Sequence, residues 1–260
     1  MKKIFAIILA AIFVLSTAAC SKQEQQSDLD YVLGKGELVV GVTEFEPMDY
    51  MDESGEWIGF DADLAKAFGE SLGVKVEFVK IEWSKKTMEL SGKTVDCIWN
   101  GMTLNDEALA SMECSNAYCS NAQIVIVPKG KENLSTEELK NLTFAVESGS
   151  AGQAAAEENG FEFVPVLSQA DAVMEVASGT SDAAIIDSLM AAAMVGEGTG
   201  YPDLTYTVSL TEEQYGVGFR KGSALAEKLN EFFKAAYADG TLLSTAEKYG
   251  VQAAVLKQEA

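Results

Sequence analysis

Polar and apolar positions alternate in blocks along this chain, and the period within each block predicts its secondary structure. In the first half, short apolar or alternating runs predict strands over residues 38–42, 75–79 and 94–99, and residues 84–90 are expected to be helical. Leu64, Phe68 and Leu72 recur every four residues, which is the period of one helical face. We expect that helix to begin with Asp61 as its cap and to end at Gly73.

The second half repeats this alternation. Apolar runs predict strands over residues 123–127, 142–146 and 182–187, and the chain is expected to return over 206–219. Ser135 and Glu138 have the spacing of a capping box before a short helix, and residues 223–237 have the apolar period of a longer one. Strands that alternate with helices predict an α/β fold with a largely parallel sheet.

One short segment recurs in both halves. Leu90-Ser91-Gly92 leads to Asp96 and a strand, and Ala177-Ser178-Gly179 leads to Asp182 and a strand. So short a repeat is compatible with two related lobes and with chance.

The first thirty residues follow a different pattern. Lys2 and Lys3 precede an apolar run over residues 4–15, too short to span a membrane, which is typical of a secretory signal peptide over residues 1–19. Small residues then lead to Cys20, as in a lipoprotein signal, where the cysteine is lipidated; Thr17 departs from the aliphatic residue usual at its position. A plain secretory signal with an incidental cysteine is the alternative. Residues 20–30 are expected to form a flexible, lipid-anchored tether.

Composition narrows the possible functions. Without the signal peptide, forty acidic residues stand against seventeen basic ones, so the net charge is near −23, which argues against nucleic-acid binding. The chain has no histidine, which excludes histidine-based triads and metal sites, and no metal or other cofactor is expected. Cys97 is expected to fill core space, whereas pairing of Cys114 with Cys119 stays open.

A polar turn is expected at Asn100-Gly101, where the apolar run ends. Small ligands tend to bind at the carboxyl ends of strands in α/β domains. Gly101 allows a close approach of its backbone N–H group, and Thr103 adds a hydroxyl group. An ordinary exit from a strand into a loop is the competing interpretation.

Together with this turn, other motifs resemble those of the extracytoplasmic solute-binding proteins that serve amino-acid ABC importers. The matching segments are Phe45-Glu46-Pro47-Met48, residues 59–64, Trp83 and residues 216–222. The resemblance implies a type II periplasmic-binding-protein fold, with a ligand cleft between two lobes and a two-strand hinge. It places lobe 1 at residues 31–125 plus 219–260 and lobe 2 at residues 126–218. It also implies a monomer that passes its ligand to a membrane permease.

The resemblance assigns ligand contacts in lobe 1 to Phe45, Trp83, Asn100, Gly101 and Thr103. The two aromatic residues match a pair that sandwiches the ligand side chain. For a cationic group, stacking on the face of an aromatic ring adds about 0.5–2 kcal/mol of cation–π attraction. The other three match the polar segment that contacts the ligand's α-amino and carboxylate groups. Taken alone, either aromatic residue is more often found in a core.

In lobe 2 the matching positions are Ser150, Ala151 and Asp187. Ser150 and Ala151 belong to the segment 148–152, which precedes the helix formers Gln153-Ala154-Ala155-Ala156. The free N–H groups of a helix N-terminus are a natural site for a carboxylate. Ala151 replaces a frequent threonine and offers only its backbone N–H group. Asp187 matches the acid that pairs with an α-ammonium group. The alternatives are a serine that merely caps the helix and a helix cap at Asp187.

Ala108 is the main departure from the family's pattern. The family usually carries an arginine there, which holds the ligand carboxylate with two parallel hydrogen bonds. The one arginine of this chain, Arg220, falls in the return segment. The carboxylate is then held by N–H groups alone or by a lysine such as Lys85 or Lys86, or the ligand has none. We therefore expect cationic amino acids or small amines to bind better than glutamate or aspartate.

These residues favour a membrane-anchored, extracytoplasmic protein that captures a small polar solute, an amino acid or a related amine, for an ABC importer. A ligand-sensing partner of a membrane receptor is an alternative. An enzyme similar to the cyclohexadienyl dehydratases agrees less well with the sequence. That chemistry needs a general acid placed over an anchored carboxylate, and the chain has no histidine and no arginine at position 108.

Overall fold

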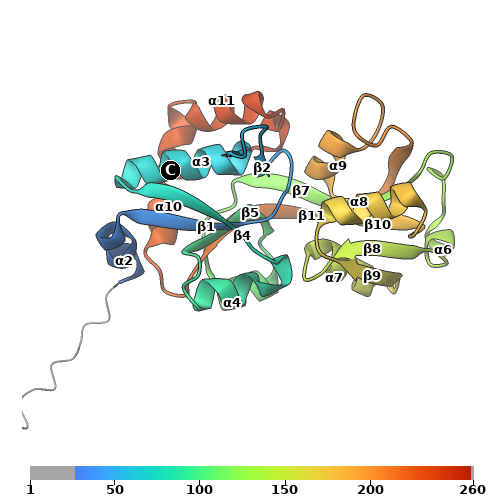
Figure 1. Ribbon diagram of the computed structural model, residues 1–260, viewed down its shortest axis with the longest axis horizontal. Helices are drawn as coiled ribbons and strands as arrows, with labels where there is room; N and C mark the ends of the chain where they lie inside the picture. The colour runs from blue at the N-terminus through green and yellow to red at the C-terminus, as the bar shows by residue number, and fades with distance from the viewer. Residues whose placement is uncertain (1–26, 259–260) are drawn as a thin grey trace, which may run out of the picture.

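A computed structural model describes residues 27–258 as two lobes joined by two long strands (Figure 1). The first lobe and the first crossing contain α2 (Asp28–Lys35), β1 (Glu37–Val42), β2 (Tyr50–Met51), β3 (Trp57–Ile58), α3 (Phe60–Leu72), β4 (Lys75–Lys80), η1 (Trp83–Lys85), α4 (Lys86–Ser91), β5 (Cys97–Thr103), α5 (Asp106–Ser111), β6 (Glu113–Cys114) and β7 (Cys119–Pro128). The second lobe and the return contain α6 (Thr136–Leu139), β8 (Thr143–Glu147), α7 (Ala151–Asn159), β9 (Glu162–Val166), α8 (Gln169–Ser178), β10 (Ala183–Asp187), α9 (Ser188–Met194), β11 (Leu204–Phe219), α10 (Leu225–Ala238), α11 (Thr241–Lys248) and η2 (Gln252–Ala254).

One sheet runs through both lobes in the order β4-β1-β5-β11-β7-β10-β8-β9. The strands β4, β1 and β5 are parallel to one another in the first lobe, as are β10, β8 and β9 in the second. Between them, β7 and β11 pair antiparallel from Cys119 opposite Tyr215 to Pro128 opposite Leu204. Parallel neighbours need helical crossovers, whereas an outward and a returning strand pair antiparallel. The predicted α/β fold with two lobes is confirmed.

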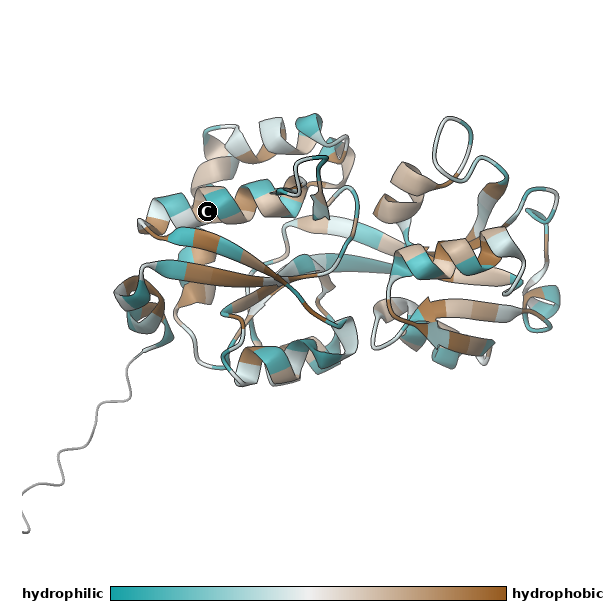
Figure 2. Cartoon of the chain, in the orientation of Figure 1, coloured by the Kyte–Doolittle hydropathy of each residue, from teal (hydrophilic) through white to brown (hydrophobic). Residues whose placement is uncertain are grey.

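The sheet of the first lobe is buried on both faces, which explains the continuous apolar run of β1. Leu38, Val40 and Val42 belong to the core beneath α3, α10 and α11, whereas Val39 belongs to the core on the side of α4. Figure 2 shows the resulting hydrophobic colour along this strand. Strands buried on both faces lose the alternation of polar and apolar positions.

Asp96 and Asp182 hold the start of a strand in the same way in each lobe. The N–H group of Asp96 donates to the carbonyl of Val39 at 2.7 Å, and its carboxylate accepts from the N–H group of Val39 at 2.9 Å. Asp182 exchanges the same two bonds with Thr143, at 3.0 and 3.1 Å. The segment that recurs in the sequence therefore forms a recurring local structure, which aligns β5 with β1 and β10 with β8.

The end of the expected tether is helical. Residues 28–35 form α2, and Arg220 holds this helix to the first lobe: its Nε lies 2.7 Å from a carboxylate oxygen of Asp28, and its Nη2 lies 2.9 Å from Asp96. These ion pairs are largely shielded from solvent, so they order residues that the composition alone assigned to a flexible tether over 20–30. The signal peptide and Cys20 lie outside the described residues.

The predicted turn at Asn100-Gly101 is wrong. The strand β5 continues to Thr103, because its pairing with β11 resumes at Met102 opposite Gly216 after an irregularity in the register. Gly101 has a φ of 56°, which glycine adopts at little cost. A bulge in the strand therefore takes the place of the expected turn.

Asp61 is not the cap of α3. The helix begins at Phe60 after Gly59, and the Asp61 side chain is fully buried. Its carboxylate accepts from the Gly101 N–H group at 2.8 Å and from the Tyr118 hydroxyl at 2.7 Å. Asp61 therefore holds the bulge of β5 from within the first lobe.

The predicted capping box at Ser135 and Glu138 is confirmed. The N–H group of Ser135 donates to the Glu138 carboxylate at 2.8 Å, and the N–H group of Glu138 donates to the Ser135 hydroxyl oxygen at 3.4 Å.

The three described cysteines have free thiols. Cys97 and Cys119 are buried and Cys114 is half-buried, so Cys97 lies in the core as expected, and Cys114 and Cys119 form no disulfide. Within residues 27–258, every helix is too short or too polar to cross a membrane.

Candidate ligand-binding site

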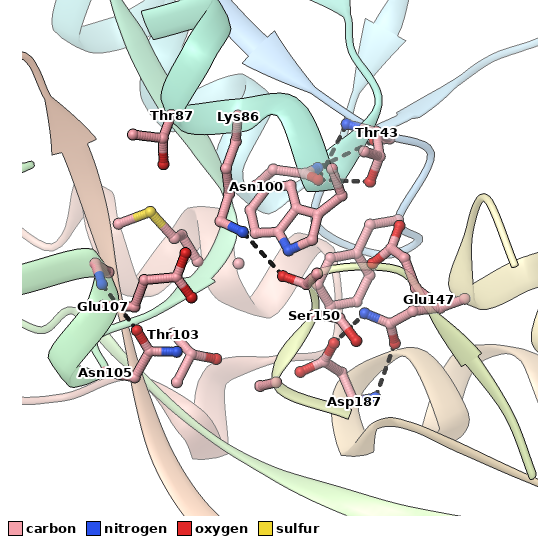
Figure 3. Close-up of a pocket in the computed structure, with 18 of the residues that line it drawn as sticks. Thr43, Lys86, Thr87, Asn100, Thr103, Asn105, Glu107, Glu147, Ser150 and Asp187 are labelled. Carbon is pink, nitrogen blue, oxygen red and sulfur yellow. Dashed lines mark hydrogen bonds between the residues drawn. The ribbon is translucent and has the colours of Figure 1, made fainter. Parts of the chain in front are cut away.

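A cavity lies between the lobes, and residues from both line it (Figure 3). It contains about 530 Å³ of empty space, including its opening to solvent. All eight residues predicted from the sequence line it: Phe45, Trp83, Asn100, Gly101, Thr103, Ser150, Ala151 and Asp187. Their roles in binding stay predictions, because proximity to a cavity does not show contact with a ligand.

Gly101 brings the Phe45 ring against β5. A Cβ atom at position 101 would lie 2.4 Å from Cε1 of Phe45 and 3.1 Å from Cε2 of Tyr215. The Phe45 ring packs edge to face on Tyr215, with ring centroids 6.3 Å apart. The N–H group expected to approach a ligand already donates to Asp61 at 2.8 Å. Gly101 therefore shapes the cavity wall, and its own N–H group is not available to a solute.

The Asn100 side chain is also fully used within the first lobe. Its Oδ1 accepts from the Thr43 N–H group at 3.0 Å and from the Thr43 hydroxyl at 2.6 Å. Its Nδ2 donates to the Thr43 carbonyl at 3.0 Å and to the Asp49 carboxylate at 2.8 Å. These four bonds are the ordinary capacity of a side-chain amide. The contact between this amide and a ligand stays a prediction, and a ligand would have to share or displace one of these four bonds.

Trp83 combines the two roles considered from the sequence. It is 8% exposed and belongs to a hydrophobic cluster with Val39 and Leu90, so it is partly a core residue. It also lines the cavity, where the Lys86 Nζ atom lies 4.9 Å from the centroid of its ring. One wall of the cavity is thus an aromatic surface that already accommodates an ammonium group.

The N-terminus of α7 forms part of the opposite wall. The Ser150 Oγ atom accepts from the Gln153 N–H group at 3.1 Å, so this serine caps the helix and lines the cavity at once. Within residues 27–258, the N–H groups of Ala151 and Gly152 have no hydrogen-bond acceptor. Gly149 touches the other lobe, because a Cβ atom there would lie 2.9 Å from Cα of Ser84.

Asp187 lies at the end of β10, and its carboxylate is surrounded by neutral donors. The Tyr215 hydroxyl and the Gln123 amide donate to it at 2.7 and 2.8 Å, and the Asn121 and Gln169 amides donate as well. Asp187 occupies the N-cap position of α9, as the alternative interpretation expected, but its side chain makes no hydrogen bond to the N-terminus of that helix. Burial raises its pKa to about 8, and the nearby Glu213 carboxylate adds to the rise.

Glu147 is a second buried acid in the cavity that sequence reasoning missed. It ends β8, the parallel neighbour of β10, and it is 3% exposed. Burial raises its pKa to about 8, Asp187 raises it further, and the Lys86 ammonium group opposes the rise. The available signal was its position: like Asp187, Glu147 closes an apolar strand just before a helix N-terminus.

Lys86 and Glu107 complete the charged lining (Figure 3). Ala108, the position where the arginine was expected, lines the same cavity, whereas Lys85 does not and instead pairs with Glu82 at 2.7 Å. The cavity thus carries three acidic side chains and one basic side chain. Among the described residues, no group of three or more acidic or cysteine side chains is placed to hold a metal ion.

The model of the bacterial extracellular solute-binding proteins, family 3, matches residues 38–252. The chain belongs to this family. Family 3 members are extracellular proteins that bind solutes, which agrees with a cavity lined by two lobes and open to solvent.

Individual proteins are similar to this chain over most of their length. The arginine-binding extracellular protein ArtP of Bacillus subtilis is 27% identical, covering 96% of this chain and 98% of ArtP. A crystal structure of a mutant of ArgBP from T. maritima is 30% identical with a TM-score of 0.80, covering 86% of this chain and 99% of that one. An ABC uptake transporter substrate-binding protein from Streptococcus pneumoniae, with bound histidine, is 27% identical with a TM-score of 0.82, covering 89% and 99%. These relatives are binding proteins rather than enzymes.

The ligand-free protein is expected to lose stability as the pH rises from about 4 to about 8. In the unfolded chain Asp187 and Glu147 lose their protons near ordinary pKa values of 3.8 and 4.5, whereas in the folded protein both pKa values are about 8. Between these values the folded state binds more protons, so each step to higher pH favours unfolding. Asp61, with a pKa of about 7, acts in the same direction.

Urea unfolding of the parent and of Asp187→Asn across this pH range measures the effect. The Asn variant should lose less stability with rising pH, because it lacks one of the carboxyl groups whose pKa is raised by folding. Glu162→Gln, which removes an exposed carboxyl group on β9, is the control and should follow the parent. Equal slopes for the parent and Asp187→Asn would show that Asp187 does not titrate in this window.

Proposed function

We propose that this chain is the solute-binding component of an amino-acid ABC importer, and that its cavity binds a small solute with at least one positive charge. Membership of family 3 supports the first part, and the similarity to ArtP supports an amino acid as the solute. The cavity lining of Glu107, Glu147 and Asp187 against the single cation of Lys86 supports the second part.

The observation that carries the proposal is the Asp187 carboxylate. It is 4% exposed, the groups that donate hydrogen bonds to it are neutral amides and a hydroxyl, and no basic group of residues 27–258 lies within 4.0 Å of it. A buried carboxylate without a cation is costly, and it avoids that cost at neutral pH by keeping its proton. A ligand ammonium or guanidinium group would supply the missing charge, with charge-assisted hydrogen bonds that neutral donors cannot match.

Closure of the lobes would follow from ligand contacts on both walls. Phe45 and Trp83 line the cavity from lobe 1, taken as residues 31–125 plus 219–260, and Ser150 and Asp187 line it from lobe 2, taken as residues 126–218. The strands β7 and β11 are the segments that cross, so they would act as the hinge. A ligand that contacts both walls stabilises the closed state by the contacts that an open state lacks.

The ligand preference is tested by calorimetric titration with L-arginine, L-lysine, L-glutamine and L-glutamate. We expect a cationic amino acid to bind at least about tenfold more tightly than glutamate, a difference of about 1.4 kcal/mol. Asp187→Asn should weaken the binding of the cationic ligand by at least about thirtyfold, since losing one partner of a buried charge pair costs about 2 kcal/mol or more. Glu162→Gln is again the control. Preferential binding of glutamate would contradict the proposal.

We also propose that the protein is held at the outer face of the cell membrane by a lipid on Cys20, after removal of residues 1–19. The support is the sequence of the signal peptide alone. Cys20→Ser should release the protein into the medium, which fractionation and immunoblotting would measure. A variant that stays with the membrane as firmly as the parent would refute the lipid anchor without affecting the proposal on the ligand.

A further inference from the structure

Lys86 places a cation in the cavity without an anionic partner. The side chain extends from the start of α4 into the space between the lobes (Figure 3). Its Nζ donates to the Gly149 carbonyl across the cleft at 2.9 Å and lies over the Trp83 ring. Within residues 27–258, no carboxylate comes within 4.0 Å of Nζ, whereas the adjacent Lys85 forms an ion pair with Glu82 at 2.7 Å.

Two further observations indicate that this ammonium group lacks compensation. Burial lowers the pKa of Lys86, and the more distant carboxylates of Glu107 and Glu147 only partly oppose that effect. An ammonium group has three N–H donors, and within residues 27–258 the Lys86 ammonium group has one hydrogen-bond acceptor, the Gly149 carbonyl. An anion in the cavity would accept the remaining bonds.

The surroundings of Lys86 suit a carboxylate. Ala108 lines the same cavity and has no charged group of its own to bind a carboxylate. On the facing wall, next to Gly149, the N–H groups of Ala151 and Gly152 have no acceptor within the described part of the chain. Lys86 and these two amides are donors from both lobes, so a carboxylate bound to them would also join the lobes.

We propose that Lys86 is the carboxylate-binding residue of this cavity, in place of the absent arginine, and that the solute is therefore an amino acid rather than a simple amine. This inference rests on the proposed function and narrows it. The ligand's carboxylate would lie on Lys86 and the N-terminus of α7, its α-ammonium group on Asp187, and a cationic side chain near Glu107 or Glu147. A ligand with two positive charges and one negative charge then pairs with two of the three acidic groups of the cavity and with its one basic group.

A purely structural role for Lys86 makes a different prediction. If the bond from Nζ to the Gly149 carbonyl only held the lobes together, loss of this bond would lower the affinity for all ligands by the same factor. If Nζ binds a carboxylate, loss of Nζ lowers the affinity only for ligands that carry a carboxylate. Pairs of compounds that differ in the carboxylate alone separate these roles: L-arginine with agmatine, and L-lysine with cadaverine.

The experiment is calorimetric titration of the parent, Lys86→Met and Lys85→Met with both pairs. The parent should bind the amino acid of at least one pair about tenfold or more tightly than its amine, because a charge-assisted pair is lost with the carboxylate. Lys86→Met should bring the amino acid to the affinity of the amine and leave the amine unchanged. Lys85→Met, which alters the neighbouring lysine outside the cavity, should behave as the parent.

A second variant tests the geometry from the other side. In the Lys86→Met background, Ala108→Arg should restore the preference for the amino acid, since a guanidinium group at that position faces the same cavity. Equal weakening of amino acid and amine by Lys86→Met, or no weakening, would refute the role of Lys86. If both agmatine and cadaverine bind the parent as tightly as their amino acids, the role of Lys86 is refuted too, with the proposed function intact. A parent that binds no cationic compound would refute both.

Discussion

The antiparallel pairing of β7 with β11 is the constraint on which the rest of the structure depends. It is the continuous connection between the parallel strands of the two lobes, so the two walls of the cavity are joined through it. Tyr215 lies on this pair. Its ring packs on Phe45 of the first lobe, and its hydroxyl donates to Asp187 of the second at 2.7 Å. One residue of the crossing strands thus positions an aromatic wall and an acidic wall together.

The charges of the cavity are arranged so that the protein alone does not balance them. Asp187 and Glu147 are buried among neutral donors, and Lys86 is bound to a carbonyl. Burial raises the pKa of the two acids and lowers that of the base, and the attraction between Lys86 and Glu147 offsets these shifts only in part. A zwitterionic ligand with a cationic side chain carries the charges that are absent. Selectivity would then come from completing these pairs, since a ligand with the wrong charge leaves them unsatisfied.

The sequence predicts the fold class well and the function of individual polar groups less well. Periodicity and capping residues such as Ser135 are local signals, and the elements they predict are present. The cavity residues were also placed together correctly by their resemblance to a known family. The hydrogen bonds that Asn100 and Gly101 make within the first lobe were not predicted, because their partners Thr43 and Asp61 lie 57 and 40 residues away in the chain.

Two further residues show where sequence reasoning ends. Glu147 was missed because an acid at the end of a strand is also a common surface residue, and only the parallel pairing of β8 with β10 places it beside Asp187. Lys85 and Lys86 were indistinguishable because they are adjacent. The passage from η1 to α4 falls between them, and it turns Lys86 toward the cavity and Lys85 toward Glu82.

A crystal structure of the protein with L-arginine tests the central claim most directly, because it shows which protein atoms complete the charges of the ligand. The account predicts arginine between Phe45 and Trp83, with a ligand nitrogen within hydrogen-bond distance of the Asp187 carboxylate and contacts from both lobes. Arginine bound elsewhere, or in the cavity with its carboxylate rather than a nitrogen facing Asp187, would contradict the account.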